Sequence, residues 1–112
     1  MDDRVAIITG ASRGLGKSMA HALAEAGAVI VSGSQAHYPQ VMEFYDDAFI
    51  HYGLGNLFFD QMGDIPFYPG IRREFIDRYV IYNGEVVSVE LLTTMLMDYS
   101  RPRPMTPEER AS

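Results

Sequence analysis

The chain has 112 residues, of which 47% are hydrophobic and 21% charged, and its formal net charge is −6. This composition excludes a disordered chain and a large multidomain protein, and the negative charge argues against a nucleic-acid-binding surface. No cysteine is present, so disulfide bonds and thiolate metal sites are excluded. No apolar run reaches the roughly 18 residues of a membrane span. The start Met-Asp-Asp is acidic where a signal peptide is basic, so we expect a cytoplasmic protein with no membrane partner.

A strand–helix–strand pattern opens the chain. Residues 5–8 and 28–31 are short apolar runs that predict buried strands. Between them, residues 14–26 are rich in alanine and carry apolar side chains at helical spacing, and Gly27 is placed to end the helix. Units of this kind are almost always right-handed with parallel strands.

A glycine-rich turn joins the first predicted strand to the helix. Residues 9–16 read Thr-Gly-Ala-Ser-Arg-Gly-Leu-Gly. Gly10 permits a tight turn, while Gly14 and Gly16 let backbone amides and the helix N-terminus approach a pyrophosphate. On these residues, positions 5–31 resemble the N-terminal nucleotide-binding unit of the short-chain dehydrogenase/reductase family, whose fingerprint is Thr-Gly-x-x-x-Gly-x-Gly.

The resemblance implies a dinucleotide cofactor and its contacts. The cofactor-binding residues that it implies are Gly10, Ser12, Arg13, Gly14, Leu15 and Gly16. In that family, a basic residue just before the second glycine favours NADP, and Arg13 occupies this place. NAD-preferring members usually carry an acid at the end of the second strand, where this chain has none. NADP is therefore the cofactor that the resemblance implies.

The catalytic pair of that family is absent. Its members use a tyrosine whose pKa is lowered by a lysine four residues later, but Lys17 is the only lysine here and precedes every tyrosine. The chain is also too short for that family's complete catalytic domain. The leading prediction is therefore a truncated or fused short-chain dehydrogenase/reductase-like NAD(P)-binding protein that cannot transfer hydride alone. The catalytic residues are unknown, and whether the chain is an enzyme stays open.

The remainder of the chain has a different composition. All six phenylalanines and seven tyrosines lie between Tyr38 and Tyr99, and the residues beyond Gly33 carry the whole net charge. Residues 39–52 predict a second helix with an aromatic stripe. Residues 101–112 contain three prolines and predict a flexible tail.

A β-hairpin is predicted around Asn83 and Gly84, because both residues tolerate the positive φ of a type I′ turn. An uninterrupted ladder from that turn places Asp77 directly opposite Glu90, an unfavourable pairing of like charges. Both faces of the hairpin are largely apolar, which favours a partner subunit as cover and hence a homo-oligomer.

Together these elements predict an α/β fold. A Rossmann-like strand–helix–strand unit is followed by a helix and an antiparallel β-hairpin in a single small domain over residues 1–100. Within it, residues 1–35 form the dinucleotide-binding-like unit and residues 36–100 the aromatic-rich helix and hairpin segment.

Several alternatives remain beside the leading prediction. Residues 11–18 also satisfy a relaxed phosphate-binding-loop pattern, with Lys17 as its lysine. Glu43, Asp47 and His51 are spaced to share one helix face and could ligate a metal, but an ordinary polar face accounts for them better, so no metal site is expected. The chain could instead be a non-enzymatic homodimeric association module that uses the Rossmann-like unit as a scaffold. It could also be a small enzyme with an unrecognised site within residues 38–99.

Overall fold

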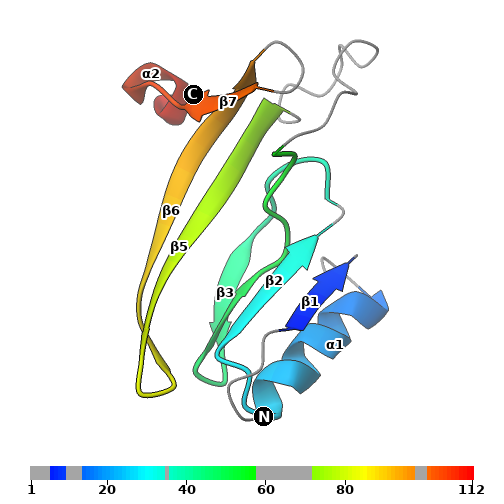
Figure 1. Cartoon of the computed structure of the whole chain (residues 1–112). Coiled ribbons are helices and arrows are strands. Elements are labelled where there is room, and N and C mark those ends of the chain that lie inside the picture. Colours follow the sequence, from blue (N-terminus) through cyan, green and yellow to red (C-terminus); the bar gives the residue numbers. More distant parts are fainter. Residues whose placement is uncertain (1–5, 10–13, 35, 58–71, 98–100) are drawn as a thin grey trace.

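The computed structural model describes the chain except for residues 1–5, 10–13, 35, 58–71 and 98–100. The described residues form seven strands in two sheets and two helices (Figure 1). Because the fold is mostly β, the predicted α/β Rossmann-like fold is wrong. No helix in the described part of the chain is long and apolar enough to cross a membrane.

The first sheet contains four strands in the order β1-β2-β4-β3. Its elements are β1 (Ala6–Thr9), α1 (Gly14–Glu25), β2 (Ile30–Ser34), β3 (Met42–Tyr45) and β4 (Ala48–His51). β1 and β2 pair in parallel with α1 between them, and β4 adds in parallel to β2. The sheet then ends in the antiparallel β3–β4 hairpin, so no second helix crosses over it as a Rossmann fold requires.

This β3–β4 hairpin replaces the helix predicted over residues 39–52. Tyr45 pairs with Ala48 across a two-residue turn, in which Asp46 and Asp47 adopt φ angles of 48° and 64°. Aspartate is among the few non-glycine residues that adopt positive φ readily, and two such residues make the turn that suits a hairpin. The aromatic spacing that predicts a helix is therefore divided between two strands.

Helix α1 covers one face of the first sheet through its alanines. The core beneath it consists of Ala20, Ala24, Ala28, Val31, Ala48, Ile50 and Tyr52. Small side chains let the helix axis approach the sheet closely. Leu15 and Met19, which belong to the predicted apolar stripe of the helix, are instead 78% and 49% exposed.

The second sheet contains β5 (Arg73–Tyr82), β6 (Glu85–Met97) and β7 (Arg101–Pro104) in the order β5-β6-β7. Its long β5–β6 hairpin lies against the first sheet on the side opposite α1 (Figure 1). The predicted Asn83-Gly84 turn is confirmed, with φ angles of 51° and 75°. The first sheet is therefore covered by a helix on one face and by a second sheet on the other.

A β-bulge alters the register of this hairpin. Ile81 pairs with Val86 but Val80 pairs with Ser88, so Val87 is an extra residue on β6. Beyond the bulge, Glu90 faces Arg78 and forms an ion pair with it, so the predicted opposition of Asp77 and Glu90 is wrong. Asp77 is thereby paired with Leu91.

The C-terminal residues form regular structure where a flexible tail is predicted. After β7, helix α2 (Pro107–Ala111) begins with a reciprocal capping box between Thr106 and Glu109. Arg103 on β7 donates two hydrogen bonds to the Glu109 carboxylate, at 2.8 and 2.6 Å. The prolines fit here because one lies in the first turn of α2 and the others on a strand at the edge of the sheet.

Acid is expected to release α2 from β7. Hydrogen bonds from Arg103, then from the Thr106 backbone N–H, lower the pKa of Glu109 from 4.5 to about 2. A lowered pKa in the folded state stabilises the contact above pH 4.5, and this contribution is lost as the pH falls towards 2. NMR chemical shifts of the α2 amides should report this transition. Glu109→Gln should remove it, whereas Glu85→Gln, on the exposed hairpin end, should leave it unchanged.

Candidate functional site

A hydrogen-bonded network of polar side chains joins the two sheets. Ser32 on β2 is paired with His51 on β4, so both side chains project from the same face of the first sheet. This face is opposite the one that packs on α1, which carries Val31 and Ile50. Asp77 and Tyr79 are two residues apart on β5, so they share one face of their strand. The hydrogen-bonded order across the interface is Ser32–Tyr79–Asp77–His51.

The hydrogen bonds of this network indicate which of its atoms carry protons. The Tyr79 hydroxyl donates to Asp77 Oδ2 at 2.9 Å, and His51 Nδ1 lies 2.6 Å from the same oxygen. An ionised carboxylate only accepts, so Nδ1 carries a proton and Ser32 donates to the Tyr79 oxygen at 3.1 Å. Burial, with the bond to Asp77 as a further cause, raises the pKa of Tyr79 to about 12. Tyr79 is therefore a protonated donor near neutral pH.

Two atoms of this polar network have unused hydrogen-bonding capacity. Among the described residues, His51 Nε2 and Asp77 Oδ1 have no hydrogen-bond partner, and they belong to side chains that are 0% and 2% exposed. The His51 ring packs between Phe75 and Phe49, whose centroids lie 5.3 and 6.1 Å away. Buried polar groups in native proteins are normally hydrogen-bonded. An unpartnered carboxylate oxygen in apolar surroundings therefore marks a candidate binding position.

A cavity of about 280 Å³ adjoins Asp77 at the junction of the sheets. The apolar part of its wall comes from Leu54, Leu57, Phe75 and Ile76. Its polar part comes from Ser32, Tyr79, Asp77 and Glu74. A backbone hydrogen bond from Phe75 N–H to the Leu54 carbonyl, at 2.7 Å, holds the two sides of this cavity together. We take this cavity and the polar network beside it as the candidate functional site, called the inter-sheet site below.

Glu74 is a second acid in the wall of the cavity, but it is three residues from Asp77 on β5, so its side chain projects from the opposite face of the strand, beside Thr94 on β6. Its side chain is almost completely buried. Burial raises the pKa of Glu74, and a side-chain hydrogen bond with Thr94 offsets part of this rise. A carboxyl group whose pKa is raised in the folded state stabilises the fold below its unfolded value of 4.5, and this contribution is lost as the pH rises through the folded pKa.

Replacing this carboxyl group by an amide should stabilise the unliganded protein at neutral pH. Glu74→Gln keeps the shape of the side chain but removes the cost of burying a charge. The melting temperature should rise at pH 8 and change little at pH 4, as measured by circular dichroism. Glu90→Gln, whose parent side chain is 49% exposed, is the matched control and should show no such stabilisation. An equal effect of Glu74→Gln at both pH values would contradict the expectation.

A separate polar cluster lies on the α1 side of the first sheet. His21 Nε2 is 2.9 Å from Glu43 Oε1 and 3.1 Å from the Tyr52 hydroxyl, which itself donates to Glu43. The bond from Tyr52 and then that from His21 lower the pKa of Glu43. Every one of these groups has a partner within the cluster, which indicates a structural role.

The residues weighed as metal ligands are separated by the sheet. Glu43 projects towards α1, His51 towards the second sheet, and Asp47 lies in the β3–β4 turn. Residues four apart share a face in a helix but not across two strands joined by a turn. Within the described ranges, no group of three or more His, Cys, Asp or Glu side chains is arranged to hold a metal ion.

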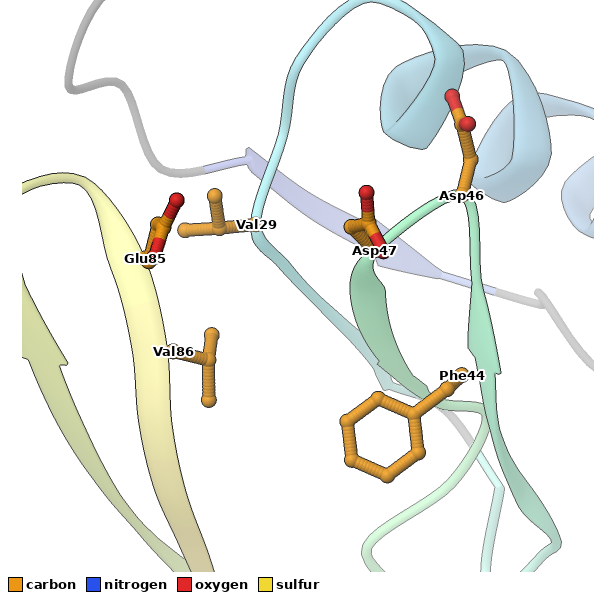
Figure 2. A pocket seen from close by; sticks show the side chains of 6 residues that line it. All are labelled: Val29, Phe44, Asp46, Asp47, Glu85 and Val86. Carbon is orange, nitrogen blue, oxygen red and sulfur yellow. The ribbon is translucent and has the colours of Figure 1, made fainter.

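A second hollow lies between the β3–β4 turn and the Asn83-Gly84 end of the hairpin. Its volume is about 720 Å³, and Figure 2 shows Glu85 and Val86 on one side facing Val29, Phe44, Asp46 and Asp47. All three carboxylates are exposed. Exposed acids in an open hollow are solvated, so this feature lacks the buried unpartnered groups of the inter-sheet site.

The predicted cofactor-binding residues fall at the start of α1 or before it. Gly10, Ser12 and Arg13 lie outside the described residues, while Gly14, Leu15 and Gly16 form the first turn of the helix. Their cofactor-binding role stays a prediction. Lys17, the lysine of the alternative phosphate-loop pattern, places its ammonium 5.7 Å from the centre of the Tyr52 ring.

Sequence reasoning did not identify the inter-sheet site. Ser32 belongs to no motif, and His51 and Asp77 belong to different predicted elements. The residues that hydrogen-bond are 26 and 47 positions apart, for His51–Asp77 and Ser32–Tyr79. No local spacing rule covers such distances.

Part of the chain is similar to a known protein family. Residues 14–61 match the family described as bacterial capsule synthesis protein PGA_cap. No curated protein matches the chain. The resemblance to short-chain dehydrogenases/reductases is therefore wrong as an assignment of family, and so is the NAD(P)-binding oxidoreductase-like function drawn from it. The same match contradicts the alternative of a homodimeric association module.

The matched segment is also a structural unit. It begins at the first residue of α1 and includes β2, β3 and β4. All seven residues of the core beneath α1 lie inside it. Ser32 and His51 of the inter-sheet site lie inside it as well, whereas Asp77 and Tyr79 follow it in the chain.

Proposed function

We propose that this chain takes part in bacterial capsule synthesis. The observation that carries the proposal is the match of residues 14–61 to the PGA_cap family. The match gains weight because it covers a packed set of elements with its own core rather than a stretch of similar composition.

We place the working site of that function at the inter-sheet site. The first sheet supplies Ser32 and His51 from within the matched segment, and the second sheet supplies Asp77 and Tyr79. The four side chains are fixed to one another by hydrogen bonds, and a cavity opens beside them. A cavity with a mostly apolar wall and a few convergent polar groups is the usual form of a small-molecule binding site.

Gene deletion with complementation tests the proposal. Deleting the coding sequence from the strain that encodes it should abolish or thin the capsule, measured by negative-stain light microscopy and by the yield of capsular polymer. Expression of the unaltered chain should restore the capsule. A deletion strain with a normal capsule would refute the role in capsule synthesis.

A hydroxyl deletion tests the placement of the site. Tyr79→Phe keeps the ring but removes the group that connects Ser32 to Asp77. It should restore the capsule poorly. The matched control is Tyr45→Phe, because the Tyr45 hydroxyl donates a hydrogen bond to the exposed Glu25 on the opposite face of the sheet. Full restoration by Tyr79→Phe would show that the site lies elsewhere, while the role in capsule synthesis would stand.

A further inference from the structure

Phe44 lies on the face of the first sheet that meets the second sheet, yet it is 71% exposed. It pairs with Phe49 across the β3–β4 hairpin, so the two rings project from the same face, and their centroids lie 5.3 Å apart. The Phe49 ring is buried, and its centroid lies 6.0 Å from that of Tyr79 on β5. The second sheet therefore covers Phe49 but leaves Phe44, on the edge strand β3, uncovered.

The hollow of about 720 Å³ lies where Phe44 is left uncovered. Towards the top of Figure 2 are three carboxylates, those of Asp46 and Asp47 on the β3–β4 turn and that of Glu85 at the end of the long hairpin. Below them in the same view lie Phe44 and Val86. The hollow therefore combines an apolar surface with three negative charges.

The three carboxylates have no counter-charge within the described ranges. None of the lining residues is a lysine, arginine or histidine, and none of the three acids takes part in an ion pair there. Asp46 and Asp47 adopt positive φ angles in a two-residue turn, which keeps two like charges side by side. Like charges gathered on a surface produce a negative potential that attracts cations. A single metal ion is not indicated, because no group of three acids or histidines in these ranges is arranged to hold one.

The occupant of the hollow must match both kinds of side chain. A lysine or arginine does so, because its apolar stem packs on apolar surface while its charged head reaches a carboxylate. Such a head group can also lie over an exposed aromatic ring such as that of Phe44. Three carboxylates call for several cationic side chains, and a peptide supplies them along one backbone.

The exposure of the hollow favours a peptide over a small molecule. Small-molecule sites enclose most of their ligand and have mostly apolar walls. Here all three acids and Phe44 are exposed. We propose that this hollow is a docking surface for a basic peptide segment of a partner protein, with its cationic groups on the three carboxylates and an apolar side chain against Phe44 and Val86.

Binding of synthetic peptides to the purified full chain tests the proposal. The probe is acetyl-Lys-Lys-Leu-Lys-Lys-amide, and its binding is followed by ¹⁵N NMR. Binding should saturate and should shift the amides of residues 44–47 and 84–87. It should weaken as NaCl is raised from about 50 to about 500 mM, because exposed charges are screened by salt.

Two matched peptides separate the charge from the apolar group. The peptide with glutamine in place of every lysine should bind at least about tenfold more weakly, because it lacks the cations. The peptide with serine in place of leucine should bind about fivefold more weakly, because it buries less apolar surface. Both comparisons use the unaltered protein and so do not depend on the folding of a variant.

Protein variants locate the contacts. Asp46→Asn, Asp47→Asn and Glu85→Gln should each weaken binding by about two- to fivefold, the range of one exposed ion pair, and the triple variant by at least about tenfold. Asparagine adopts positive φ as readily as aspartate, so these changes keep the turn. Phe44→Ala should weaken binding by about fivefold. Glu108→Gln removes a charge from α2, at the opposite end of the long hairpin (Figure 1), and should leave the affinity unchanged.

The proposal is overturned if the lysine–leucine peptide shows no saturable binding, if either matched peptide binds as tightly, or if the triple variant keeps full affinity. Tighter binding of spermine than of the peptide would show that the hollow takes a small polyamine and would also overturn it. These measurements concern the purified chain alone, so the role in capsule synthesis stands or falls separately with the deletion strain.

Discussion

Asp77→Ala is expected to lower the free energy of unfolding by about 1–3 kcal/mol for each of the two buried donors that lose their acceptor. The substitution leaves the His51 imidazole, which is fully buried, without an acceptor for its Nδ1 proton. It also removes the acceptor of Tyr79, so the Ser32–Tyr79 hydrogen bond is left to join the sheets without Asp77. Chemical denaturation of the purified chain measures the change.

An exposed ion pair in the same hairpin provides the control. Arg78 and Glu90 face each other across β5 and β6, and their side chains are 68% and 49% exposed. Glu90→Ala should therefore cost only about 0–1 kcal/mol, as is typical of exposed pairs. If Asp77→Ala costs no more than Glu90→Ala, the His51–Asp77 pair does not hold the sheets together.

Local patterns in the sequence predicted the elements that depend on neighbouring residues. The Asn83-Gly84 turn was predictable because both residues favour the backbone conformation that a two-residue hairpin needs. Helix α1 and strand β2 were predictable from an alanine-rich helical pattern followed by an apolar run. In these places, local preference and tertiary packing favour the same structure.

Prediction failed where the decisive contacts are distant or the turn is unusual. The Asp46-Asp47 turn lacks the asparagine–glycine pair typical of such turns, and aromatic residues near helical spacing obscured the alternation of β3 and β4. The bulge at Val87 has no local marker, yet it determines that Arg78, and not Asp77, meets Glu90. The assignment of family failed because the glycine-rich turn fits a nucleotide-binding pattern, whereas the family match begins only at residue 14 and continues through the β3–β4 hairpin.

The inter-sheet site could not be predicted because its residues come from two separate sheets. The first sheet brings Ser32 beside His51 through the parallel pairing of β2 and β4. The second brings Asp77 and Tyr79 to one face of β5. Only the packing of one sheet on the other brings the four side chains into hydrogen-bonding distance. Alternation within a strand indicates which residues share a face, but not which faces meet.

Gly33→Ala is the second substitution with a large expected effect, because β2 lies too close to the residue that follows β4, Tyr52, for any side chain at this position. A Cβ atom at Gly33 would lie 2.2 Å from the carbonyl oxygen of Tyr52 and 2.7 Å from its carbonyl carbon. These are backbone atoms, so no side-chain rotation relieves the overlap. The strands must separate, and we expect a loss of about 3 kcal/mol of stability, at the upper end for overpacking by one methyl group.

The separation should also be visible at the inter-sheet site, since Ser32 precedes Gly33 on β2 and His51, the last residue of β4, precedes Tyr52. In ¹⁵N NMR spectra, Gly33→Ala should shift the amides of Ser32, His51 and Tyr79 together, and chemical denaturation should give the loss of stability. Ser34→Ala is the control, because Ser34 is exposed at the end of the same strand and should change stability by less than about 0.5 kcal/mol. A Gly33→Ala protein as stable as the Ser34→Ala protein would mean that β2 and β4 are farther apart in solution than in this structure, and that Ser32 and His51 are not held side by side.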